Sequence, residues 1–321
     1  MRLACTAIAL ALLSGCGRGY ADFALPELHT QGSAGPFTWM PNAAPVIERG
    51  DASDVLNPSV VRIQGVYWNL YSEFDGGAWH TAAATSNDGI AWTPLGRVIS
   101  PNPQDGAYIA ANGSALPVGS ELWYWYETGY PLRIALARSS DGITWTREPG
   151  FVLDRGLYRS FDELAVADPY VVRAGDFFYM FYLGQDRANR QQLGVARSVD
   201  GVSWEKLRTN PILSGGPTNA FDEELGEPAV WSSGGWWWML YTGRAHDERR
   251  ALGLARSRNG VDWTRVPEFR IEGDQPWNSK VLADPTVEPL PDGTIRVWFG
   301  GGDVASPDQG LHGQIGVGIL H

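Results

Sequence analysis

A short motif recurs five times along this chain of 321 residues. Each copy starts with an Asn, Asp or Glu, continues in four of the five cases with Pro, and leads into strand-forming residues. The copies start at Asn57, Asn112, Asp168, Glu227 and Asp284, at intervals of 55, 56, 59 and 57 residues. Self-similarity at a period of this size is typical of propellers and solenoids, whose repeats stack into one body. We therefore expect a single domain built from five similar units.

The third unit shows its strand pattern most clearly. It contains four strand-like segments, at residues 168–173, 177–182, 192–198 and 204–213, separated by turn-forming residues. Four short antiparallel strands make up one blade of a propeller. We therefore predict an all-β fold, a five-bladed β-propeller.

A second motif, Ser-x-Asp/Asn-Gly-x-x-Trp, marks the turn between the third and fourth segments of four units. Its copies end at Trp92, Trp145, Trp204 and Trp263. Asp-Gly and Asn-Gly favour a tight hairpin, and the Trp can pack beneath the Gly, so we assign these motifs no chemistry. The fifth unit ends at His321 without a fourth segment. Residues 36–48 are predicted to supply it and so to close the ring.

The first residues are typical of an exported protein. Arg2 and the apolar run at residues 3–13 indicate a secretory signal over residues 1–15, too short to span a bilayer stably. The small residues before Cys16 resemble a lipobox, so we expect Cys16 to be lipidated and to anchor the protein in the bacterial cell envelope. The alternative is an ordinary secreted protein. Residues 16–35 are then expected to be a tether, and residues 36–321 the propeller.

Composition narrows the possible partners. The formal net charge of −11 argues against nucleic acid, because phosphate binding needs clustered Lys and Arg. The 15 Trp and 12 Tyr suit the apolar faces of sugar rings, although core packing accounts for more than half of the aromatic residues. His80, His246 and His312 lack a metal-binding spacing, so we predict no catalytic zinc and no cofactor, and we leave open a structural ion in the axis. We expect a monomer.

The five repeated positions carry the candidate chemistry. In a propeller the first strand of every blade lines the axis, so these residues form a ring facing one funnel. Three carboxylates at close range raise one another's pKa, and one of them should hold a proton near neutral pH. A protonated carboxyl facing an ionised one is what glycoside hydrolysis requires. The structural alternative is that each carboxylate only caps the start of its strand.

In this period, in the Asp-Pro and Glu-Pro strand starts and in the turn motif, the chain resembles the five-bladed propeller glycosidases of glycoside hydrolase family 43, and more loosely families 32 and 130. In families 43 and 32, blade one carries an Asp that is base or nucleophile, blade three an Asp that orients the substrate and tunes the acid, and blade four the Glu acid. The resemblance therefore implies that Asp168 is the tuning carboxylate and Glu227 the general acid.

The position of the family's base is occupied by Asn57, whose amide cannot take a proton from water. Three alternatives follow: Asp284 is the base, Asp54 reaches in from the preceding loop, or no base exists. In the last case the protein is a phosphorylase that uses an anionic nucleophile, or a carbohydrate-binding propeller without activity. We favour Asp284 because it belongs to the ring.

The loops around the mouth of the funnel are expected to determine which sugar is bound. Candidate substrate-binding residues are the ring amides Asn57 and Asn112, the stacking platforms Trp79 and Trp277, and the polar residues His80, Arg187 and Arg244. Arg187 and Arg244 could neutralise an acidic sugar or a phosphate, or could simply pair with nearby acids. Phe161-Asp162-Glu163 recurs as Phe221-Asp222-Glu223, so part of its role is expected to be structural.

Overall fold

The computed structural model describes residues 19–28 and 31–321, and this part of the chain is all-β apart from two short 3-10 turns, η1 (Pro103–Asp105) and η2 (Pro276–Asn278). The predicted signal at residues 1–15 and the predicted lipidation site Cys16 lie outside the described residues. Within the described ranges, no helix is long and apolar enough to span a membrane.

Antiparallel pairing joins the described strands into five consecutive groups. The first contains β3 (Asp54–Ile63), β4 (Val66–Phe74), β5 (Trp79–Ser86) and β6 (Thr93–Ile99). The second contains β7 (Ile109–Val118), β8 (Glu121–Thr128), β9 (Arg133–Ser139) and β10 (Thr146–Arg147). The third contains β11 (Ala165–Ala174), β12 (Phe177–Gln185), β13 (Gln191–Ser198) and β14 (Glu205–Leu207).

The last two groups follow the same order. The fourth contains β15 (Glu224–Ser233), β16 (Trp236–Arg244), β17 (Arg250–Ser257) and β18 (Thr264–Ile271). The fifth contains β19 (Val281–Pro289), β20 (Ile295–Gly302), β21 (Gln314–Leu320) and, from the other end of the chain, β2 (Trp39–Pro41). Short parallel contacts join β5 to β7 and β17 to β19, so hydrogen bonding links the groups into sheets of five, eight and eight strands.

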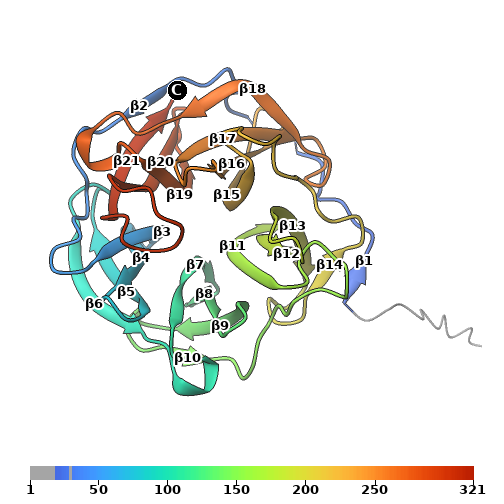
Figure 1. Cartoon of the computed structure of the whole chain (residues 1–321), viewed down its shortest axis with the longest axis horizontal. Coiled ribbons are helices and arrows are strands. Elements are labelled where there is room, and N and C mark those ends of the chain that lie inside the picture. Colours follow the sequence, from blue (N-terminus) through green and yellow to red (C-terminus); the bar gives the residue numbers. More distant parts are fainter. Residues whose placement is uncertain (1–18, 29–30) are drawn as a thin grey trace, which may run out of the picture.

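Figure 1 shows the first strands, β3, β7, β11, β15 and β19, around the middle of the molecule, with the later strands of each group farther out. Apolar side chains fill the space between neighbouring groups. Trp125 of the second group, for example, packs with Phe178 and Trp204 of the third. The repeated sequence positions are therefore brought to the centre by repeated packing of one sheet against the next.

Residues 19–28 are part of the packed body. β1 (Tyr20–Ala21) pairs in parallel with β14, and the Leu25 side chain is buried between the third and fourth groups. The Leu25 amide also donates to the Asn259 carbonyl at 2.8 Å. The interpretation of residues 16–35 as a tether is therefore wrong for this described stretch, because its apolar residues Phe23, Leu25 and Leu28 pack against the core.

The repeated turn motif has the structural role predicted for it. Ser198 Oγ accepts the N–H groups of Asp200 (3.2 Å) and Gly201 (2.8 Å), and Trp204 Nε1 donates to the Gly201 carbonyl at 3.1 Å. The first copy differs: Trp92 Nε1 has no partner among the described residues, and Trp298 from the fifth group donates to the Gly89 carbonyl instead.

Replacing Ser198 by alanine should lower the free energy of unfolding by about 1–3 kcal/mol, because it leaves the buried Gly201 N–H without an acceptor. Urea unfolding of the purified protein measures the change. Val199→Thr in the same turn, at a side chain that is 66% exposed, is the control and should be nearly neutral. Equal stability of the Ser198 variant and the wild type would contradict this role.

Candidate active site

Each of the five repeated residues sits at a kink in its first strand. All have positive φ, with values of 50° (Asn57), 47° (Asn112), 49° (Asp168), 40° (Glu227) and 55° (Asp284), and each lies at a shift in strand register. Positive φ is uncommon in residues other than Gly, and clusters of such residues occur at functional sites. The kink turns each backbone amide away from its own sheet, so the amide needs a partner elsewhere.

That partner is always a side chain of the preceding group. The five bonds run from Asn57 N to Asp284 Oδ2 (3.2 Å), Asn112 N to Ser72 Oγ (2.8 Å), Asp168 N to Glu127 Oε1 (2.6 Å), Glu227 N to Asp168 Oδ2 (3.1 Å) and Asp284 N to Thr242 Oγ1 (3.1 Å). These bonds offset the cost of the kinks and lock neighbouring groups together.

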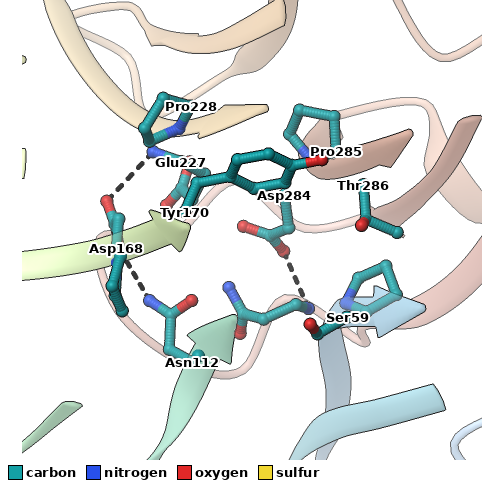
Figure 2. Close-up of a pocket in the computed structure, with 13 residues that line it drawn as sticks. Ser59, Asn112, Asp168, Tyr170, Glu227, Pro228, Asp284, Pro285 and Thr286 are labelled. Carbon is teal, nitrogen blue, oxygen red and sulfur yellow. Dashed lines mark hydrogen bonds between the residues drawn. The ribbon is translucent and has the colours of Figure 1, made fainter. Parts of the chain in front are cut away.

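The five residues line one pocket. Its wall also contains Tyr170 and the prolines that follow four of the five ring residues. Figure 2 shows Asp168, Glu227 and Asp284 turned toward the same space from three different groups. The structure therefore brings together the three carboxylates and two amides whose spacing suggested a ring.

Both carboxyl oxygens of Asp168 accept hydrogen bonds from neighbouring residues. Its side chain is 6% exposed, Oδ1 accepts from Asn112 Nδ2 at 2.6 Å, and Oδ2 accepts the Glu227 amide at 3.1 Å. Because both oxygens already accept hydrogen bonds, Asp168 is suited to orienting its neighbours rather than to taking a proton from water.

Glu227 is suited to holding a proton. Burial is the largest cause that raises the pKa of its carboxyl well above the ordinary value, and the negative charges of Asp168 and Asp284 raise it further. Arg250 and a hydrogen bond with Thr242 oppose this shift. The carboxyl that lies in the acid position of the repeat thus favours its protonated form.

Asp284 has the opposite preference near neutral pH. Burial raises its pKa to about 6, the charge of Arg250 and the Asn57 amide lower it, and Asp168 raises it. Above that value it is an anion that faces a protonated Glu227. Two titratable groups with separated pKa values in one pocket have the properties that an acid and a base require.

Two charged residues beside this pocket were not among the catalytic candidates selected from the sequence. Glu127, on β8, is 3% exposed and contacts both Asn112 and Asp168. Arg250, at the start of β17, interacts electrostatically with Glu227 and Asp284 and donates to the Ser306 (3.1 Å) and Pro307 (2.6 Å) carbonyls. Glu127 was recognisable as a single acid at the end of the strand sequence Trp-Tyr-Trp-Tyr-Glu, whereas Arg250 left no comparable signal.

Asp54 does not reach this pocket, so the proposal that it is the base is wrong. It is fully buried, Oδ2 accepts the Gly310 amide at 2.6 Å, and Oδ1 accepts the Gly313 amide at 2.8 Å. It is not among the described residues that line the pocket. Its carboxylate instead fixes the loop at residues 303–313, which Figure 1 shows beside β3.

Asp54→Asn should lower the free energy of unfolding by about 1–3 kcal/mol, because an amide oxygen replaces only one of the two acceptors. The catalytic activity of the Asp54→Asn variant should keep the pH dependence of the wild type. Denaturant unfolding and a pH–rate profile test both statements, and a variant of normal stability without activity would restore Asp54 as a candidate base.

Of the two predicted stacking platforms, Trp79 is a core residue and Trp277 is partly buried against the core. Trp79 is 6% exposed and packs on Phe74 with ring centroids 5.0 Å apart. Trp277 stacks on Phe299 and donates from Nε1 to the Ala43 carbonyl at 2.9 Å. Both rings therefore stabilise the loops around the axis, and neither is among the described residues that line the pocket.

The polar residues predicted on the loops already have partners. His80 lies between Asp75 and Ser100, Arg187 pairs with Glu163 and stacks over Tyr158, and Arg244 pairs with Glu224 and Glu248. The pocket as described contains none of the three in its lining. The structural alternative, pairing with nearby acids, describes them better than sugar or phosphate binding.

The repeated Phe-Asp-Glu segments are structural, as expected in part. Asp162 accepts from Lys206 Nζ at 2.5 Å, and Asp222 accepts from Arg265 Nε at 2.7 Å, so each Asp is paired with a cation from the fourth strand of the group that follows it. In the described ranges no three His, Cys, Asp or Glu side chains are grouped as a metal site.

Comparison with known proteins identifies the family. The model of the glycosyl hydrolases family 32 N-terminal domain matches residues 59–281, which is more than half of the chain. The chain belongs to this family. The match agrees with the resemblance to propeller glycosidases, although the sequence motifs favoured family 43 over family 32.

Individual relatives are more distant. An uncharacterized protein of Mycobacterium tuberculosis is 28% identical over 234 residues, which cover 65% of this chain and 75% of the relative. A thermostable family-43 glycoside hydrolase has a TM-score of 0.65 at 17% identity, with 83% of this chain and 88% of that chain covered. The β-1,2-mannobiose phosphorylase of Listeria innocua has a TM-score of 0.70 at 12% identity, with 88% and 96% covered. These structures show that the fold is that of propeller glycoside hydrolases and related enzymes.

Proposed function

We propose that this protein is a glycoside hydrolase with a five-bladed propeller closed by β2, and that it cleaves an oligosaccharide or polysaccharide with inversion. The observation that carries the proposal is that two buried carboxyls with different preferences line one pocket: Glu227, whose raised pKa favours its protonated form, and Asp284, whose pKa of about 6 favours the ionised form at neutral pH. Family membership supports the reaction class.

In this proposal Glu227 donates its proton to the leaving glycosidic oxygen while Asp284 takes a proton from the attacking water. Asp168 holds the Glu227 backbone amide and keeps a negative charge beside the acid. In this scheme the anomeric configuration is inverted, because water activated by Asp284, and not Asp284 itself, attacks the sugar carbon.

A second function is supported by one observation. Asn57 occupies the position where the resemblance implies a base, and its amide cannot activate water. The chain would then be a phosphorylase that uses inorganic phosphate as nucleophile, or a propeller that binds carbohydrate without cleaving it. The similarity of its fold to a phosphorylase is compatible with the first of these.

Incubation of the wild type with panels of aryl glycosides, oligosaccharides and polysaccharides, with and without inorganic phosphate, separates these functions. Hydrolysis without phosphate, with an inverted anomer seen first by NMR, is the expected result. Turnover only with added phosphate would identify a phosphorylase, and binding without turnover would identify a carbohydrate-binding protein. Fractionation of cells that express the full chain tests the further proposal that the protein is exported, lipid-anchored through Cys16 and monomeric.

A further inference from the structure

In three of the five groups described, the same position on the second strand carries a side chain that binds the backbone amide of the ring residue in the next group. In the first and fourth groups this position holds Ser72 and Thr242, whose hydroxyls accept the amides of Asn112 and Asp284. In the second group it holds Glu127, which accepts the Asp168 amide. The hydroxyls of Ser72 and Thr242 are sufficient to accept a backbone amide at this position. The carboxyl of Glu127 is therefore not needed for the backbone contact alone.

The surroundings of Glu127 bring it close to Asp168. Asn112 Nδ2 donates to Glu127 Oε1 at 2.7 Å and to Asp168 Oδ1 at 2.6 Å, so one amide nitrogen bridges two carboxyl groups. Both carboxyl groups are buried, and among the described residues no Lys, Arg or His forms an ion pair with either. Two adjacent buried carboxylates without a cation cannot both be charged at ordinary cost.

We propose that Glu127 is a positioning residue that keeps its proton at neutral pH and uses it to donate a hydrogen bond to Asp168, so that the Asp168 carboxylate keeps a fixed orientation beside Glu227. The inference rests on the proposed glycosidase function only for its effect on turnover. Asp168 then receives hydrogen bonds from Asn112, Glu127 and the Glu227 amide, and these donors hold the negative charge that keeps the proton on Glu227.

The electrostatics of the pair agree with this geometry. Burial is the largest cause that raises the pKa of Glu127 well above its ordinary value, followed by the charge of Asp168 and a side-chain hydrogen bond to it. The other titratable groups that interact with Glu127 are Glu227, Tyr108 and Tyr124, and these bring no positive charge. The Asp168 backbone N–H, which donates to Glu127 Oε1, lowers this pKa, but burial and the charge of Asp168 act in the opposite direction and outweigh it.

Two substitutions distinguish a positioning role of Glu127 in catalysis from a purely structural role. Glu127→Gln keeps an acceptor for the Asp168 amide and an N–H donor for the Asp168 carboxylate, so kcat should stay within about threefold of the wild type. Glu127→Thr copies the residue of the fourth group: it keeps the backbone contact and loses the donor. For this variant kcat should fall by about 10- to 100-fold with KM little changed.

The pH–rate profile of Glu127→Thr provides a further test, because the loss of a purely structural contact would leave the pH dependence of the rate unchanged. Without this donor the Asp168 carboxylate is held less firmly beside Glu227, so its charge supports the Glu227 proton less strongly and the alkaline limb of the rate profile should shift to lower pH. Glu121→Thr, at an exposed glutamate of the same strand, is the matched control. Equal losses of activity in the Gln and Thr variants, with an unmoved alkaline limb, would overturn the inference.

Infrared spectroscopy tests the proton itself, independently of any activity. Beside the band of the protonated Glu227 carboxyl, the wild type at pH 7 should show a second carbonyl band of a protonated carboxyl, and this second band should be missing from both Glu127 variants. If this band is present while no substrate is turned over, the proposed function fails and the proton assignment to Glu127 stands. If spectra of wild type and Glu127→Gln are identical in this region, Glu127 is ionised and the inference is wrong.

Discussion

Replacing Glu227 by glutamine is expected to lower kcat for glycoside hydrolysis by about 10²- to 10⁴-fold. Glutamine has almost the same shape, and the Glu227 backbone amide would keep its bond to Asp168. What is lost is the proton, which burial and the charges of Asp168 and Asp284 hold on the wild-type carboxyl. The measurement is steady-state kinetics on a substrate identified from the panel, together with binding of the same substrate to the variant.

Leaving-group dependence makes this prediction specific to a general acid. A nitrophenyl glycoside needs little help from an acid, so its turnover should fall much less than that of an oligosaccharide. Glu224→Gln is the matched control, because Glu224 belongs to the same strand but pairs with Arg244 outside the pocket lining described here. If both classes of substrate lost the same factor, or if Glu227→Gln kept normal activity, another group would be the acid.

The spacing of the repeat was sufficient to predict which side chains meet. Asn57, Asn112, Asp168, Glu227 and Asp284 were selected by period alone, and they line one pocket. This worked because each unit packs against the next in the same way, so equal sequence positions become equal positions around a centre. The positive φ values and the hydrogen bonds between groups could not be predicted from the sequence, because they depend on which side chain of the preceding group accepts the backbone amide.

Loop residues were predicted poorly for a physical reason. Trp79 and Trp277 have the composition of sugar-binding platforms, but their burial depends on partners such as Phe74 and Phe299 that only the folded chain brings near. Glu127 was not assigned to the ring because the ring was defined by first strands alone, although Glu127 lies fifteen positions after Asn112, as Ser72 does after Asn57. A search for polar residues at equal positions of the second strands would have found it.

Asp284→Asn should remove the acidic limb of the pH–rate profile. In the wild type, kcat/KM should rise with pH through about 6, as Asp284 becomes ionised, and should fall at higher pH, where Glu227 loses its proton. An amide cannot take a proton from water, so the variant should be about 10²- to 10⁴-fold slower than the wild type above pH 6, and the difference should shrink below pH 6, where the wild type slows and the variant does not. Rates measured across the pH range on one substrate test this, and a variant that kept the wild-type acidic limb would exclude Asp284 as the base.

The same variant should gain stability as it loses activity. The pKa of Asp284 is raised in the folded protein from 3.8 to about 6, so the native state binds more protons than the unfolded state between these values, and stability is lost as pH rises through this window. Asparagine does not ionise and can still accept the Asn57 amide, so the variant avoids this loss. At pH 7 its free energy of unfolding should exceed that of the wild type by up to about 3 kcal/mol, whereas near pH 4 the two should be similar. Urea unfolding of both proteins at pH 4 and pH 7 tests this prediction. If the variant is less stable than the wild type at pH 7, the Asp284 carboxylate stabilises the fold as a strand cap and is not kept for catalysis.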